Sequence, residues 1–302
     1  MTLAPSYRAG TIKRTRRTRV EVEQLDFQIY NVLAEDHPQS VRHVFYRMTD
    51  PRLPEPVEKS DRGYRQVQDR CVKLRRSGAI PFGWITDASR QGYYTTTYGD
   101  AEDFLRSVNG LYRADLWRDA PFYCEVWTES RSIAGVILAD CRDLAVNLYP
   151  AGGFTSISFA HGAAEFINDQ YAGRGVVIFY IGDYDPAGVL IDVALERELR
   201  EHLDPNVDLS FERLGITPKQ IAEYDLPTKP RKATDRRSMQ ITGTVEAEAM
   251  PARIMRELLR DEVEALLPRR ALEVAKAAEQ SERALLDRAA KWVGRERGRT
   301  AQ

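Results

Sequence analysis

Three acidic residues occur where two apolar segments end. Glu129 follows the segment 122–127, and Asp183 and Asp185 follow the continuous apolar run 175–181. In open α/β sheets, functional groups collect at the carboxyl ends of the strands. Three carboxylates there would repel one another unless a cation intervened. Because carboxylate oxygens suit Mg²⁺, with Mn²⁺ as the alternative, this pattern predicts a metal site at Glu129, Asp183 and Asp185.

The spacing of the acidic pair supports this interpretation. Asp183 and Asp185 are two residues apart, so in an extended chain they point the same way. Taken alone, the pair also fits a surface turn whose aspartate caps a helix. Glu125 is a rival for the metal, but it lies within the predicted strand, so Glu129 is preferred. A second acidic pair falls in an expected strand, and we interpret it as an exposed strand face: Glu246 and Glu248.

A candidate nucleophile lies upstream, in the string VRHVFY at 41–46. Arg42 and Tyr46 are four residues apart, so on a helix they share a face. A guanidinium there would lower the pKa of the phenol and hold a phosphate. The simpler interpretation of the spacing is that Tyr46 packs between helices. Carboxylates alone fit metal-assisted hydrolysis, whereas an attacking tyrosine would indicate covalent chemistry.

Hydrophobic periodicity predicts the elements that hold Tyr46. A helix is expected over 22–35, and a second is expected from Ser40, as its cap, to Met48. A third helix over 61–78 is followed by a short strand at 80–85. Three helices and a strand outline a winged helix-turn-helix of the CAP-like type, with the third helix in the recognition position.

Strands and helices alternate after residue 121, which predicts a parallel α/β sheet in a chain that is α+β overall. The expected strands are 122–127 and 175–181, and the expected helices are 132–149, 161–171, 189–202 and most of 250–297. A helix is also expected over 100–118. The predicted organisation has four parts: a basic arm (1–21), a winged-helix domain (22–115), a metal-binding domain with a basic loop (116–263) and a helical tail (264–302).

Positive charge is clustered although the formal net charge of the 302 residues is −1. Contacts to a DNA backbone need only positive charge and reach, so local clusters matter more than the sum. A solvated surface is the alternative interpretation of each cluster. The candidate DNA-binding residues are Arg65, Arg70, Lys73, Arg75 and Arg76 in the third helix and Lys229, Lys232, Arg236 and Arg237 in an expected ordered loop over 215–237.

Other features narrow the class of protein. No apolar run approaches the roughly 20 residues of a membrane span, and residues 1–20 contain no apolar signal core. The three cysteines fit neither a disulfide framework nor a zinc site. We therefore expect a cytoplasmic, nucleoid-associated protein with no membrane partner.

Together these motifs resemble the topoisomerase VI A-subunit family, including the Topo mini-A proteins of mobile genetic elements. That family has an Arg four residues before an attacking Tyr, followed by a Toprim domain with a Glu and an Asp-x-Asp. The resemblance covers about residues 25–200. Phe45 replaces the first Tyr of the family's usual pair, and Ser130 stands where a base usually follows the Glu. The matching positions are Arg42, Tyr46, Glu129, Asp183, Asp185, Pro186 and Gly188.

The resemblance implies a type IIB topoisomerase-like enzyme that cleaves double-stranded DNA. Tyr46 would form a 5′-phosphotyrosyl link, assisted by Mg²⁺ at the Toprim carboxylates. A homodimer would share each site between protomers, and a separate ATPase B-type subunit would drive strand passage. Two alternatives stay open: a Toprim-type nuclease with water as the nucleophile, and a non-catalytic DNA-binding partner.

Overall fold

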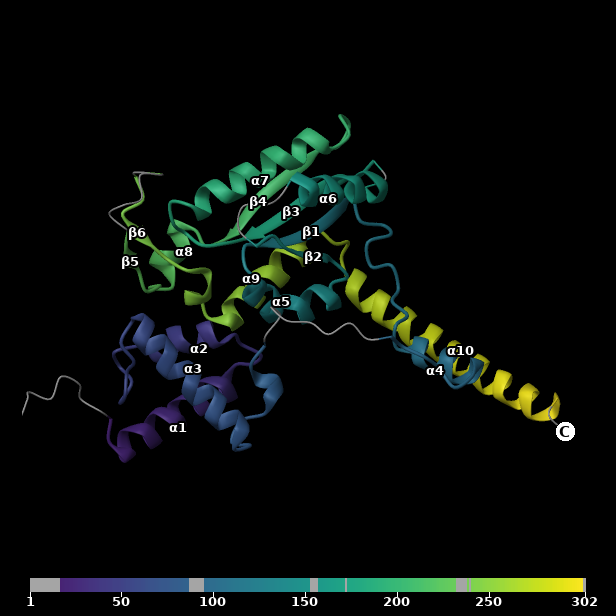
Figure 1. Ribbon diagram of the computed structural model, residues 1–302. Coiled ribbons are helices and arrows are strands. Elements are labelled where there is room, and N and C mark those ends of the chain that lie inside the picture. The colour runs from purple at the N-terminus through teal and green to yellow at the C-terminus, as the bar shows by residue number, and fades with distance from the viewer. Residues whose placement is uncertain are drawn as a thin grey trace, which may run out of the picture.

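Three helices form the N-terminal unit of the computed structural model, which describes residues 17–86, 95–152, 157–171, 173–231, 238 and 240–300. They are α1 (Arg19–Glu35), α2 (Val41–Met48) and α3 (Asp61–Arg76) (Figure 1). Each begins with a hydroxyl side chain that accepts a hydrogen bond from a backbone amide of the first turn: Thr18, Ser40 and Ser60. The three predicted helices are confirmed, and α1 also includes the last residues of the predicted arm.

The strand predicted at 80–85 is wrong. The chain instead forms a 3-10 turn, η1 (Phe82–Trp84), and only Ile85 forms a β-bridge, with Gln39. Arg75 donates to the carbonyl oxygens of Phe82 and Ile85 and lies over the Phe82 ring, which holds the segment in a turn. The described part of the N-terminal unit therefore consists of three helices and a 3-10 turn, with no strand that could form a wing.

A four-stranded parallel sheet follows, with the order β2-β1-β3-β4. Its strands are β1 (Phe122–Thr128), β2 (Asn147–Pro150), β3 (Gly175–Ile181) and β4 (Leu209–Gly215). The strands are connected by α5 (Arg131–Asp143), α6 (Ile157–Gln170) and α7 (Gly188–His202). The α/β class with a parallel sheet is confirmed. The single helix predicted over 132–149 is wrong at its end, because the chain turns at Ala145, which has a φ of 52°, into β2.

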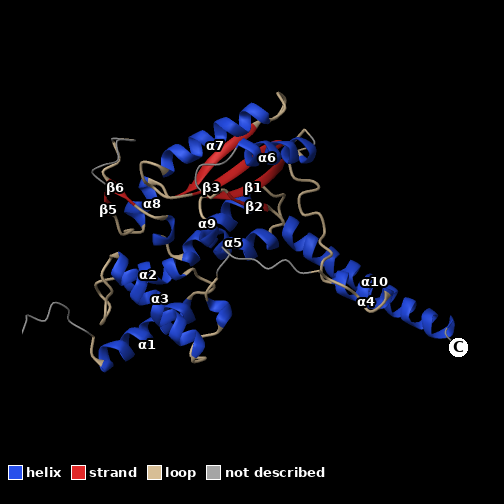
Figure 2. Cartoon of the chain, in the orientation of Figure 1, coloured by secondary structure: helices blue, strands red, loops and turns tan. Residues whose placement is uncertain are grey.

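Both faces of the sheet are covered, as the continuous apolar run of β3 requires. Val177 and Phe179 face α5 and α9 (Ala252–Ala265), whereas Ile178 and Tyr180 face α6 and α7. Figure 2 shows the strands between these two helical layers. The carboxyl ends of β1 and β3 are thus held by packing on both sides.

The remaining elements lie around this body. They are α4 (Ala101–Asn109), α8 (Pro218–Glu223), the hairpin of β5 (Lys229–Pro230) and β6 (Gly243–Thr244), the 3-10 turn η2 (Ala247–Ala249) and α10 (Ala271–Thr300). The helix expected over 100–118 ends at Asn109, and the expected loop 215–237 contains α8 and β5. α10 extends away from the body with α4 along it (Figure 1). No helix in the described ranges has the length and apolar character needed to cross a membrane.

One buried ion pair joins the N-terminal unit to α9. Asp36, which follows α1, accepts hydrogen bonds from the Arg253 amide at 3.0 Å and from the Arg256 guanidinium. Arg256 also donates to the carbonyl oxygen of Pro38 at 3.1 Å. The side chains of Asp36 and Arg256 are 5% and 16% exposed, so solvent screens this pair little. The pair fixes the start of α2 against the sheet domain.

Replacement of Arg256 by Gln is expected to destabilise the fold by about 3 kcal/mol, because it leaves the Asp36 carboxylate buried and unpaired. The measurement is urea unfolding followed by circular dichroism. Arg253→Gln is the matched control on the same helix, since its pair with Glu257 is more than half exposed and contributes under about 1 kcal/mol. Equal losses in the two variants would contradict the assigned role.

Candidate functional site

Glu129 and Asp183 meet at the point where the strand order reverses. β2 lies on one side of β1 and β3 on the other, so the chain leaves the carboxyl ends of β1 and β3 in opposite directions. Such points form a natural crevice in open sheets. The amide of Asp183 donates to Glu129 Oε2 at 2.8 Å. The structure therefore brings these two predicted metal residues together.

Asp185 is placed differently from its two companions. Its Oδ1 accepts from the amides of Ala187 and Gly188, at 2.8 and 2.6 Å, at the start of α7. A Cβ on Gly188 would lie 2.2 Å from the carbonyl oxygen of Asp183, so only glycine fits this turn. Asp185 thus caps a helix through one oxygen, and its charge still raises the pKa of Glu129.

Burial and mutual repulsion define the electrostatics of the carboxylates. Burial, then the charge of Glu129, raises the pKa of Asp183 to about 8, and the Ala247 amide, 2.8 Å from Asp183 Oδ1, opposes the shift. The pKa of Glu129 is raised by burial first and then by Asp185 and Glu248. The raised pKa values reflect burial first and neighbouring negative charge second, and a bound cation would offset both effects.

Glu246 and Glu248 belong to this site, so their interpretation as an exposed strand face is wrong. β6 ends at Thr244, and Glu248 lies in η2 with only 6% of its surface exposed. Glu248 accepts hydrogen bonds from the hydroxyls of Ser132 and, at 3.4 Å, Ser130. The sequence signal was the acidic pair itself. Its significance was hidden because Arg42, which pairs with Glu246, and the two serines that bind Glu248 lie more than a hundred residues away.

Tyr46 lies in α2 with 6% of its surface exposed. The ammonium groups of Lys59 and Lys229 lie 5.5 and 5.7 Å from the centre of its ring. Burial, then the charge of Glu246, raises the pKa of Tyr46, and the opposing effect of Arg42 is smaller. Arg42 therefore lowers the pKa of this phenol, as expected, but burial and Glu246 outweigh it, so the pKa is raised overall.

The segment 246–248 joins the tyrosine to the carboxylates. Glu246 forms ion pairs with Arg42 and Lys229, and the next residue, Ala247, donates to Asp183. Arg42 also lies 5.0 Å from the centre of the Tyr64 ring. Tyr46 and the Toprim-like carboxylates are thus linked within one chain, whereas the resemblance implied a site shared between protomers.

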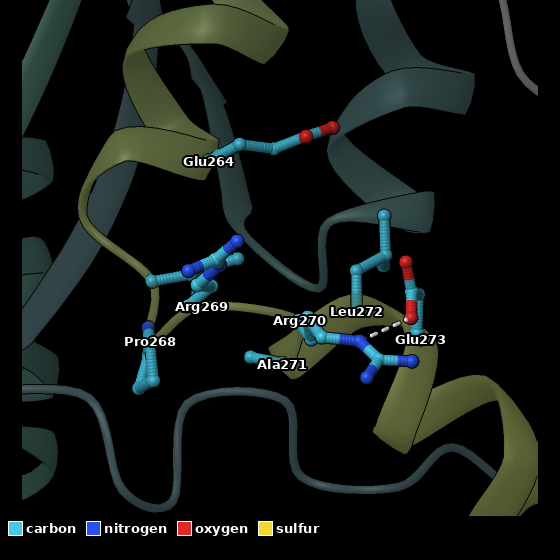
Figure 3. A pocket seen from close by; sticks show the side chains of 8 residues that line it. Glu264, Pro268, Arg269, Arg270, Ala271, Leu272 and Glu273 are labelled. Carbon is cyan, nitrogen blue, oxygen red and sulfur yellow. Dashed lines mark hydrogen bonds and ion pairs between the residues drawn. The ribbon is translucent and has the colours of Figure 1, made fainter.

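A cleft of about 750 Å³ opens beside Tyr46. Arg47, Thr49 and Arg52 line one side, and Tyr224 and Thr228 line the other. A second hollow, of about 270 Å³, lies at the junction of α9 and α10 (Figure 3). Its lining includes an Arg270–Glu273 ion pair of 2.8 Å but none of the candidate residues. Of these two hollows, the cleft is the one lined by a candidate residue, Tyr46.

The chain matches no family model, no curated protein and no solved structure. Function is therefore argued from the residues that the fold brings together.

The candidate DNA-binding residues fall into four groups. Arg65, Lys73 and Arg76 are exposed on α3. Arg70 and Arg75 instead make contacts within the unit, Arg70 with Asp26 and Arg75 with η1. Lys229 pairs with Glu246 at 2.8 Å, which places it at the tyrosine. Three further residues lie outside the described residues: Lys232, Arg236 and Arg237.

Glu125, the rival metal residue, is separate from this site. It is fully buried in β1 and accepts from the Tyr123 hydroxyl at 2.7 Å and the Trp127 indole at 2.8 Å. Burial raises its pKa to about 7. Its side chain points to the face covered by α6, because Tyr123 and Trp127 pack there. The preference for Glu129 over Glu125 agrees with this geometry.

The donor set at the switch point suits a hard cation. Within the described residues, no three His, Cys, Asp or Glu side chains are already arranged to hold a metal ion. Glu129 and Asp183 nevertheless supply adjacent carboxylates whose pKa values are raised by burial and by neighbouring acids. Carboxylate oxygens in such a cluster are the ligands that Mg²⁺ and Mn²⁺ prefer.

Asp183→Asn should stabilise the metal-free protein at pH 8 but not at pH 4. The folded chain holds the pKa of Asp183 at about 8, against 3.8 when unperturbed. The cost of ionising it therefore appears above pH 4 and grows until about pH 8. Asparagine keeps the acceptor for the Ala247 amide and removes the charge. We expect a melting temperature higher by on the order of 5 °C at pH 8 in EDTA.

The control for this experiment is Asp261→Asn, at an exposed position of α9. An Asp183→Asn protein that melts at or below the wild-type temperature at pH 8 would show that the carboxylate is not under electrostatic strain.

Proposed function

We propose that this chain cleaves double-stranded DNA by the covalent chemistry of type IIB topoisomerases, with a helix-turn-helix unit of the winged-helix type and a Toprim-type carboxylate site. The observation that carries the proposal is the segment 246–248. It connects Tyr46 and its three cations to Glu129 and Asp183 in one chain. The proposed nucleophile, the cations that would bind a phosphate and the carboxylates that would bind a metal ion are therefore connected through this one segment.

The reaction is a transesterification at phosphorus. The Tyr46 oxygen bonds to phosphorus while the bond from phosphorus to the 3′ oxygen breaks. The phenol loses its proton to the surrounding groups or water, and the departing 3′ oxygen takes up a proton. Arg42, Lys59 and Lys229 lie where they would neutralise the phosphate oxygens. One phosphodiester is exchanged for another, so the step is chemically reversible.

Glu129 and Asp183, with Asp185 beside them, are the residues that would hold the metal ion. When bound, Mg²⁺ or Mn²⁺ supplies positive charge for the phosphate and the leaving oxygen. The protein's own contribution is to hold the two carboxylates in place through the amides of Asp183 and Ala247. Neutralising Glu129, Asp183 or Asp185 would weaken the attraction for a cation.

Partners follow from the same proposal. The exposed cations Arg65, Lys73 and Arg76 of α3 would contact the DNA backbone, as expected for the helix in the recognition position. Cleavage of both strands requires two sites, which a homodimer supplies. A separate ATPase subunit would be required for strand passage, and the DNA substrate implies a place in the nucleoid.

A second candidate function is a metal-dependent nuclease in which water attacks the phosphate. The burial of Tyr46 and the upward shift of its pKa favour this alternative, because a buried, protonated phenol is a weak nucleophile. In that case Tyr46 packs α2 and the carboxylates alone are required for cleavage.

Tyr46→Phe separates the two functions. The wild type is incubated with supercoiled plasmid and Mg²⁺, denatured, and analysed with and without protease. We expect protein linked to 5′ ends in the wild type and none in the variant, because phenylalanine has no oxygen to attack phosphorus. Tyr30→Phe, at an exposed position of α1, is the control. Free ends that persist in Tyr46→Phe would establish the nuclease instead.

Substitutions of the α3 cations should differ in how they change the salt dependence of DNA binding. Lys73→Gln is expected to weaken DNA binding and to reduce the slope of log K against log salt by about 0.9, the value for one phosphate contact. Arg70→Gln should lower stability and leave that slope unchanged, because Arg70 is paired with Asp26 inside the unit. Fluorescence anisotropy across a salt series gives the slopes. A slope unchanged in Lys73→Gln would remove that residue from the DNA interface.

A further inference from the structure

Glu246 is held as a two-oxygen anion between two cations. Its Oε2 accepts from the Arg42 guanidinium, and its Oε1 accepts from the Lys229 ammonium at 2.8 Å. The two cations come from different elements, Arg42 from α2 and Lys229 from β5. Arginine and lysine bind the two free oxygens of a phosphodiester in the same manner.

Lys59 adds a third cation, which sequence patterns did not indicate. It lies in the loop before α3, donates to the carbonyl oxygen of Thr228 at 3.0 Å, and places its ammonium 5.5 Å from the centre of the Tyr46 ring. Burial, then the charge of Lys229, lowers the pKa of Lys59 to about 8. Lys59 and Lys229 repel one another, and the single carboxylate beside them is Glu246. The site can therefore bind a further anion, or a stronger one.

The loop that carries Lys59 is fixed in place by tight packing. A Cβ on Gly63 would lie 1.9 Å from the carbonyl oxygen of Glu58 and 2.8 Å from Val57, so only glycine allows α3 to start this close. The cleft beside Tyr46 is also lined by Thr228, whose carbonyl holds Lys59. Lys59 is therefore held directly against a residue that lines the cleft.

We propose that Glu246 is an internal substitute for a DNA backbone phosphate: it fills the anion site formed by Arg42, Lys59 and Lys229 beside Tyr46, and a phosphate of bound DNA replaces it. This inference rests on the proposed function and adds an autoinhibitory contact to it. Replacement of Glu246 by a phosphate would also affect the candidate metal site, because Ala247, the next residue, donates a hydrogen bond to Asp183 Oδ1.

The test compares DNA affinity in the full chain carrying Tyr46→Phe, which cannot form a covalent link. Binding of a labelled duplex oligonucleotide is measured by fluorescence anisotropy in EDTA. Adding Glu246→Gln removes the competing charge and should tighten binding about tenfold, while adding Lys59→Gln removes a cation of the site and should weaken it about fivefold.

Matched controls separate the site from bulk charge. Glu35→Gln removes a carboxylate that pairs with Arg47 on the same unit and is 68% exposed. Lys276→Gln removes an exposed lysine of α10. Both should change affinity less than about twofold, as isolated surface charges do. If Glu246→Gln binds no tighter than Glu35→Gln, or Lys59→Gln no weaker than Lys276→Gln, the inference is overturned.

Two further outcomes are informative. If Glu246→Gln unfolds, as its melting curve would show, Lys59→Gln decides alone, because it leaves both ion pairs of Glu246 intact. If the wild type forms no covalent adduct while Glu246→Gln still binds DNA more tightly, the anion site stands and the covalent function fails. Adduct formation without tighter binding in Glu246→Gln overturns only this inference.

Discussion

Burial of two neighbouring carboxylates at the carboxyl ends of β1 and β3 is the constraint around which this structure is arranged. Glu129 and Asp183 lie side by side with raised pKa values, and the amides of Asp183 and Ala247 are the donors that offset their charge. Ala247 comes 64 residues after Asp183 along the chain. The chain must therefore fold back so that the segment containing Ala247 lies next to the end of β3. This segment is η2, and α9 packs behind it.

The return of that segment also places the tyrosine. α9 packs on the sheet and binds Asp36 through Arg256, so the N-terminal unit is held where α2 contacts η2. Arg42 then reaches Glu246, and Lys59 and Lys229 both lie near the Tyr46 ring. The position of the tyrosine and the position of the carboxylates are consequently two results of one packing arrangement.

Local signals made α2 and β3 predictable, since Ser40 is a strong helix cap and the run 175–181 has the composition of a buried strand. β2 and β4 were missed for different reasons. β2 has four residues directly after an amphipathic helix, and β4 is a partly exposed edge strand with little apolar alternation. Glu129 and Asp183 were predictable from their place after strands. The role of Glu246 was not, because its burial and its partners arise only from tertiary contacts.

A net charge of −1 does not prevent this chain from binding a polyanion, because the relevant charge is local. A phosphodiester carries the same single charge as the Glu246 carboxylate, so replacing one by the other leaves the charge balance of Arg42, Lys59 and Lys229 unchanged. The gain from new ion pairs is then nearly offset by the loss of the old ones. Because the ion pairs lost and gained are so similar, the exchange of Glu246 for a phosphate depends on where the phosphate is held more than on its charge. A duplex held by the exposed cations of α3 can bring a phosphate to the cleft at high local concentration, whereas free anions in solution cannot.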